Sequence, residues 1–241
     1  MPRTLETQLR KTYFSLRIGV AALGMIFPFL LWVGGLTKHI TLRPSMSAYY
    51  YATRAYPDPP DCKEVDAAMA TLPAGTMRNW FVGFLFAVGA MLFVNKGSTD
   101  RENYALNAAG IFAAGVALCP MAWDCDSTGK FSWHGAFAFS FFAAIAFVCA
   151  FCADDTLHYL PQAEQGKFRN TYRALALFMV ASPATAWAFN VFTQQTSKIY
   201  WTEVFGIESF ALYWLVKSHE IAKITRERRS NALSSEEHLL V

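Results

Sequence analysis

Three ionisable side chains lie near the ends of separate apolar segments of the chain: Asp124, His134 and Glu203. A carboxylate–imidazole pair such as Asp124 and His134 could transfer protons, and with a serine from a neighbouring loop it could hydrolyse a substrate within the membrane. The three side chains could instead hold Zn²⁺, with His39 as a fourth ligand, although no H-E-x-x-H spacing specifies a metal. We favour ion pairing at the rim of a helix bundle. We therefore predict no cofactor and leave open whether the protein is an enzyme.

A second group of residues has the chemistry of a headgroup site. Arg43 and Arg78 could each bind a phosphate through two parallel hydrogen bonds. Ser45 and Ser47 could cap a short helix in the same loop. Tyr50 lies in a run of three tyrosines, whose rings suit the level of lipid headgroups. Together they predict a phospholipid or glycolipid headgroup site, and a loop that binds nothing is the alternative.

One carboxylate lies inside an apolar segment. Glu208 follows Tyr200 by eight residues, which places it about 12 Å along a helix and near the middle of a bilayer. A carboxylate at that depth is protonated or paired. Glu208 could therefore serve a small proton-coupled transporter, or it could form a structural hydrogen bond to a neighbouring helix.

The five cysteines predict at most one disulfide. Cys62 and Cys125 fall in two segments expected on the same outer side, where an oxidising compartment would let them pair. Cys149 and Cys152 form a C-x-x-C at the end of an apolar segment. Redox pairs usually begin a helix, so these two are interpreted as small buried hydrophobic residues.

The elements that position these residues are long apolar runs. Of the 241 residues 54% are hydrophobic and only 16% are charged, which argues against a soluble enzyme. Six runs are long enough, or nearly so, to cross a bilayer as helices. They span about Ile18–Gly35, Trp80–Val94, Ala105–Trp123, Trp133–Cys152, Ala174–Phe192 and Tyr200–Val216. The predicted fold is an all-α, polytopic membrane bundle of six transmembrane helices.

The basic residues predict the orientation of the bundle. If the N-terminus is cytoplasmic, 14 of the 21 Lys and Arg residues fall on the inner side. Both termini are therefore expected in the cytoplasm, with a long outer loop at 37–77 between the first two spans. We expect one membrane domain at 1–229, followed by a mobile cytoplasmic tail at 230–241.

The loop and the start of the second span resemble a known family. The residues concerned are Pro44-Ser45-Met46-Ser47-Ala48, the three tyrosines that follow, and Met77-Arg78-Asn79-Trp80-Phe81-Val82-Gly83. They are similar to a group of bacterial six-span integral membrane proteins. More distantly they resemble the eukaryotic six-span family of damage-regulated autophagy modulators and the Golgi protein that helps remodel GPI-anchor lipids. The resemblance implies six spans, a link to lipids, and roles for Ser45, Ser47 and Arg78.

These observations leave four functional hypotheses. The first is a lipid-linked role, such as headgroup binding, sensing or remodelling at the outer leaflet of a bacterial inner membrane. The others are an accessory subunit of a membrane complex, a proton-coupled transporter using Glu208, and a hydrolase using Asp124 and His134. The expected partners are membrane lipids and possible membrane proteins, and no nucleic acid is expected because the basic residues follow the topology.

Overall fold

The computed structural model describes residues 5–50, 76–121, 132–192 and 197–239, and within those ranges the chain is helical with no strand. The long helices are α1 (Leu5–Thr37), α3 (Thr76–Val94), α4 (Asp100–Leu118), α5 (Trp133–Phe147), α6 (Gln162–Phe192) and α7 (Ser197–Leu239). A short 3₁₀ helix, η1 (Ser47–Tyr50), follows α1. A π-helical turn, η3 (Val148–Cys152), and a 3₁₀ segment, η4 (Ala153–Tyr159), extend α5.

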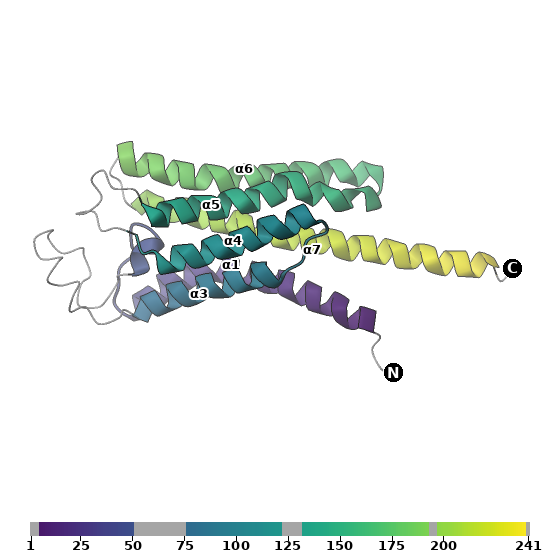
Figure 1. Ribbon diagram of the computed structural model, residues 1–241, viewed down its shortest axis with the longest axis horizontal. Helices are drawn as coiled ribbons and strands as arrows, with labels where there is room; N and C mark the ends of the chain where they lie inside the picture. Colours follow the sequence, from purple (N-terminus) through teal and green to yellow (C-terminus); the bar gives the residue numbers. More distant parts are fainter. Residues whose placement is uncertain (1–4, 51–75, 122–131, 193–196, 240–241) are drawn as a thin grey trace, which may run out of the picture.

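The six long helices form a closed ring. Each helix packs against its neighbours in the sequence, from α1 on α3 through to α6 on α7, and α7 returns to pack on α1. Both termini lie at one end of the bundle, which we call the termini end (Figure 1). At the opposite end, the loop end, α1, α4 and α6 finish and α3, α5 and α7 begin. The predicted all-α bundle is thus confirmed, and it has an up-and-down arrangement.

The outer surface of the ring is apolar on every helix. Half or more of the side chain is exposed at residues such as Val33 on α1, Phe93 on α3, Ile111 on α4, Phe139 on α5, Leu177 on α6 and Phe205 on α7. Apolar exposure of this extent is typical of contact with lipid. In the described ranges three helical stretches are long and apolar enough to cross a membrane: Thr7–Thr37, Met77–Val94 and Trp133–Tyr159. These are the features of a helical membrane protein.

Two predicted boundaries differ from the structure. The third apolar run was expected to reach Trp123, but α4 ends at Leu118 because Cys119 precedes Pro120. The residue before a proline is biased away from helical geometry, and Cys119 is extended, at φ −106° and ψ 92°. At the C-terminus, α7 continues to Leu239 through most of the segment expected to be a tail. Its mobility stays a prediction.

Two prolines lie inside helices, Pro28 in α1 and Pro183 in α6. At Pro28 in α1, the carbonyl oxygen accepts a hydrogen bond of 2.5 Å from the Tyr200 hydroxyl of α7. Near Pro183 in α6, the Ser182 hydroxyl donates to the carbonyl of Thr202 at 2.6 Å, and so joins α6 to α7 instead of serving its own helix. Both hydrogen bonds fix the start of α7 to its neighbours.

A pair of glycines lets the backbones of α3 and α4 approach closely. A Cβ added at Gly89 of α3 would lie 2.8 Å from the carbonyl oxygen of Gly110 in α4, and one at Gly110 would lie 2.6 Å from the oxygen of Gly89. Small residues permit this contact between backbones, which matters in membranes because packing stabilises helix pairs there. The glycine pair therefore brings α3 and α4 close together, and α4 lies in the ring between α3 and α5.

The glycine contact predicts a difference between two substitutions on the same helix. Gly89→Ala should destabilise the bundle by about 1–3 kcal/mol, because the new methyl group overpacks the contact with α4. Gly83→Ala is the matched control, since nothing lies within 4 Å of the added Cβ, and Ala is the better helix former. Unfolding of both variants in the same detergent measures the difference, and equal stability would contradict the packing argument.

Candidate functional site

The short helix η1 is built by local hydrogen bonds at the loop end. The amide of Ala48 donates to the Ser45 hydroxyl at 3.1 Å, and the amide of Tyr49 donates to the carbonyl of Met46 at 3.1 Å. Ser45 therefore caps η1 as the sequence predicted, and its own hydroxyl lies 3.7 Å from the sulfur of Met121. The Tyr49 ring is fully buried and lies 6.1 Å from the ring of Tyr200.

A carboxylate holds the segment before η1 onto α7. The amide of Met46 donates to Glu203 Oε2 at 2.6 Å. Glu203 lies in the first turns of α7, next to the residues that bind α1 and α6. The predicted rim carboxylate is therefore engaged by backbone, and it connects residues separated by 157 positions in the sequence.

A serine and a histidine meet beside this contact. Ser47 Oγ lies 2.7 Å from His134 Nε2, and His134 Nδ1 lies 2.7 Å from the carbonyl oxygen of Cys119. His134 is in the first turn of α5, whose N-cap is Ser132. Cys119 follows the last turn of α4, where carbonyl groups have no partner within the helix. The ends of two helices thus place the imidazole, and η1 places the hydroxyl.

The predicted arginines lie on two sides of η1. Arg43 is buried beside Tyr49, where its charge opposes the effect of burial, which raises the pKa of the Tyr49 phenol. Arg78, in the first turn of α3, is exposed, and its guanidinium lies 4.8 Å from the centre of the Tyr50 ring. The loop end therefore gathers Arg43, Ser45, Ser47, Tyr50, Arg78, His134 and Glu203 from η1, the loop before it, and three helices.

Three predicted residues lie outside the described residues: Asp124, Cys62 and Cys125. The Asp124–His134 pair, the disulfide and the Zn²⁺ site that includes Asp124 therefore stay predictions. Among the described residues, no three His, Cys, Asp or Glu side chains gather closely enough to hold a metal ion.

The other cysteine pair lies in the interior of the bundle. Cys149 and Cys152 are buried in η3, and the Cys149 thiol donates to the carbonyl of Tyr172 at 3.1 Å. Their interpretation as small buried residues agrees with this position.

Glu208 lies on an outward-facing stripe of α7. Trp201, Phe205 and Leu212 of the same stripe are each about half exposed, and Glu208 itself is partly exposed. Its Oε1 atom has no hydrogen-bond partner among the described residues. The expected structural bond to a neighbouring helix is therefore not made by this oxygen. The transport hypothesis stays a prediction.

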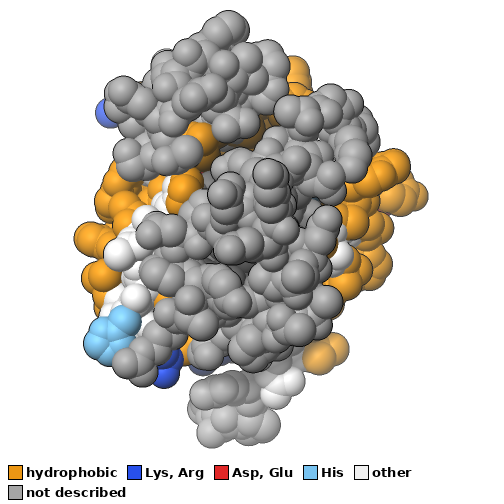
Figure 2. Space-filling model, turned by 90° about the vertical axis from the view of Figure 1, so that its left-hand side faces the viewer, with side chains coloured by type: hydrophobic (Ala, Val, Ile, Leu, Met, Phe, Trp, Pro, Cys, Tyr) orange, Lys and Arg blue, Asp and Glu red, His pale blue; other side chains and the backbone are white. Residues whose placement is uncertain are grey.

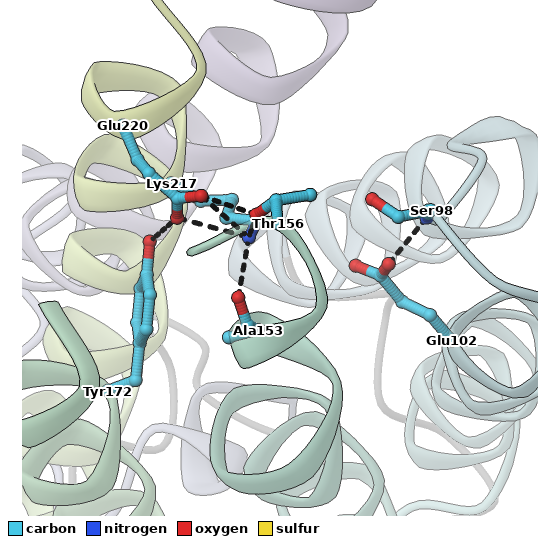
Figure 3. A network of polar contacts seen from close by, with 7 residues as sticks. All are labelled: Ser98, Glu102, Ala153, Thr156, Tyr172, Lys217 and Glu220. Atoms are coloured by element: carbon cyan, nitrogen blue, oxygen red, sulfur yellow. Dashed lines mark hydrogen bonds and ion pairs between the residues drawn. The ribbon is translucent and has the colours of Figure 1, made fainter. Parts of the chain in front are cut away.

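A buried ion pair at the termini end was not foreseen from the sequence. Lys217 donates to Glu220 Oε2 at 3.1 Å, to the Thr156 hydroxyl at 2.6 Å and to the carbonyl of Ala153 at 2.9 Å (Figure 3). Thr156 and Tyr172 in turn donate to the two oxygens of Glu220. Lys217 and Glu220 are 1% and 0% exposed. The cluster joins α7 to α6 and η4, where irregular backbone leaves the Ala153 carbonyl available.

In the sequence, Lys217 directly follows the last apolar run, a position that suits a basic topology signal. Glu220, three residues later, puts an acid and a base on one face of a helix and is the one local signal of an ion pair. Nothing in the sequence indicates that Thr156 and Tyr172 complete the cluster.

The cluster predicts a large loss of stability when one charge is removed. Glu220→Gln leaves the Lys217 ammonium buried without its counter-charge and should cost about 3–5 kcal/mol. The double variant Lys217→Met/Glu220→Leu should be more stable than that single variant, because no charge remains buried. Unfolding in detergent measures both, and a double variant that is less stable than the single one would contradict this account.

The contact between Glu203 and Met46 predicts the local mobility of η1. Glu203→Ala leaves the amide of the buried residue Met46 without its acceptor, at a cost of about 1–3 kcal/mol, so the amides of residues 46–50 should exchange with deuterium about tenfold faster. Glu164→Ala, which removes an ion pair with Lys223 at the termini end, is the control and should leave these amides unchanged. Unaltered exchange in Glu203→Ala would show that η1 is held by other contacts.

Comparison with protein-family models, with curated proteins and with solved structures finds no match to this chain. The resemblance to six-span lipid-linked proteins therefore stays an expectation, and the functional argument depends on the loop end itself.

Proposed function

We propose that the protein is a six-span membrane protein that binds the headgroup of an outer-leaflet lipid at its loop end. The six spans are the six long helices of the ring, and both termini face the cytoplasm of a bacterial cell. This orientation follows the excess of Lys and Arg in the segments at the termini end. The lipid-linked role is preferred to an accessory subunit because the loop end has its own set of polar side chains.

The observation that carries the proposal is the docking of the 45–50 segment onto three helices. Its Met46 amide binds α7, its Ser47 hydroxyl binds α5, and its Tyr50 ring lies under Arg78 of α3. A loop that served only to connect two helices has no need of contacts with α5 and α7. The segment therefore lies at the loop end of the ring, where lipid headgroups would lie.

Charge at the loop end favours an anionic or zwitterionic headgroup. Arg78 is exposed, and its guanidinium lies over the face of the Tyr50 ring. This arrangement leaves guanidinium N–H groups available to a ligand outside the protein. Glu203, the nearby carboxylate, already accepts the Met46 amide. Viewed onto the loop end, the visible described side chains are hydrophobic around the rim, with some Lys, Arg and His but no Asp or Glu (Figure 2). A phosphate is the group that such a surface recognises best.

Lipid retention tests the proposal directly. Native mass spectrometry of protein extracted gently from its own membrane should show one retained phospholipid or glycolipid class. Arg78→Ala should reduce the retained fraction about tenfold, the loss expected from one charge-assisted hydrogen-bonded contact. Lys38→Ala is the matched control, because Lys38 is an exposed cation just after α1. Equal retention in wild type and Arg78→Ala would contradict the site, and a co-purifying protein in place of lipid would favour the accessory subunit.

The orientation has its own test. Green fluorescent protein fused after Val241 should fluoresce in a bacterial host, because it folds in the cytoplasm, whereas alkaline phosphatase at the same position should be inactive. An active phosphatase fusion would reverse the predicted orientation and would place the loop end in the cytoplasm.

A further inference from the structure

The hydrogen bonds of His134 fix which of its nitrogens carries the proton. A carbonyl oxygen can only accept a hydrogen bond, so Nδ1 must donate to Cys119. In the neutral ring Nε2 then has a free lone pair, and Ser47 Oγ, at 2.7 Å, donates its proton to it. This is the tautomer in which an imidazole accepts a proton from a nucleophilic hydroxyl.

The carbonyl of Cys119 performs the positioning task that a carboxylate performs in a Ser–His–Asp triad. It orients the ring and selects the tautomer, and it is available because α4 ends just before Pro120. Ser47 is positioned by η1, which the Glu203–Met46 contact attaches to α7. His134 is buried at 8% exposure, whereas Ser47 is only partly buried. A substrate therefore meets the hydroxyl before it meets the base.

The depth of the pair matches the ester region of a lipid. Exposed tryptophans lie near the loop end of three helices: Trp80 on α3, Trp133 on α5 and Trp201 on α7. Such tryptophans are enriched at the boundary between headgroups and hydrocarbon. Trp133 directly precedes His134, and Trp201 precedes Glu203 by two residues. The Ser47 hydroxyl thus lies close to the level at which ester-linked lipids carry their carbonyl carbons.

We propose that Ser47 is the nucleophile and His134 the general base of acyl transfer from an ester-linked lipid. Ser47 Oγ bonds to the ester carbonyl carbon while His134 Nε2 takes the hydroxyl proton. The bond to the leaving alkoxide then breaks, and that oxygen takes the proton from Nε2. The acyl group on Ser47 passes to water or to the hydroxyl of a second lipid, whose proton passes through Nε2 back to Ser47 Oγ.

This inference rests on the proposed function for the identity of the substrate, but the reactivity of Ser47 can be measured without a lipid. A fluorophosphonate probe reacts with activated serine hydroxyls. Incubated with the purified full-length protein, it should modify the peptide that contains Ser47. Ser47→Ala should abolish this labelling, and His134→Gln should slow it about 10²-fold or more, the usual contribution of a general base. Ser140→Ala, elsewhere on α5, is the control and should label as the wild type does.

The variant Ser47→Cys keeps the test decisive if Ser47→Ala does not fold. Ser47→Cys keeps a nucleophile of similar size, so it should lose phosphonylation and react with iodoacetamide. That reaction should be faster than in the double variant Ser47→Cys/His134→Gln, because the imidazole assists formation of the thiolate. Equal rates in the two variants would show that His134 does not activate position 47.

The outcomes separate this inference from the proposed function. Labelling at Ser47 that depends on His134 supports acyl transfer, and it does so even if no lipid is retained. A retained lipid without labelling of Ser47 overturns acyl transfer but leaves headgroup binding in place, and the Ser47–His134 hydrogen bond would then be structural. Absence of both contradicts both proposals.

Discussion

The docking of the 45–50 segment onto the starts of α5 and α7 is the contact on which the loop end depends. It consists of two polar contacts, one from the Met46 amide to Glu203 and one from the Ser47 hydroxyl to His134. Both polar groups of the helices lie in their first turns, near the end of the apolar region, where a charge is tolerated. Without the segment, Glu203 and His134 would lie at the boundary of the hydrocarbon without these partners. The segment therefore completes the fold and creates the candidate site at the same time.

The two ends of the bundle satisfy their polar groups in different ways. At the termini end, the polar groups of Lys217 and Glu220 are satisfied within the protein. Both carboxylate oxygens accept hydrogen bonds, and the ammonium donates to Ala153, Thr156 and Glu220. Full satisfaction of this kind favours one rigid arrangement. At the loop end, by contrast, Arg78 and Ser47 keep part of their surface open. A rigid closed end and a partly open end suit a protein whose ligand arrives from one side.

The sequence predicted the helices well and the site in part. Long apolar runs indicate helices, because in lipid the backbone must make its hydrogen bonds within the chain. Each of the six predicted runs falls largely within one long helix. The predicted end of the third apolar run was wrong, because Pro120 ends α4 inside a stretch that is apolar throughout. The polar residues of the loop end were named as candidates from their types, and the structure brings several of them together, but their functional roles stay predictions. The sequence suggested a loop serine beside His134 but could not identify it as Ser47, since the two residues are 87 positions apart and no local pattern joins them.

The central claim is that the 45–50 segment, docked on α5 and α7, forms a lipid-binding surface at the loop end. A high-resolution electron cryomicroscopy structure of the protein in its native lipids tests it most directly. The account predicts lipid density beside Arg78 and Tyr50, with Ser47 in hydrogen-bond contact with His134. A loop end without lipid, in which this segment lies away from His134 and Glu203, would contradict it.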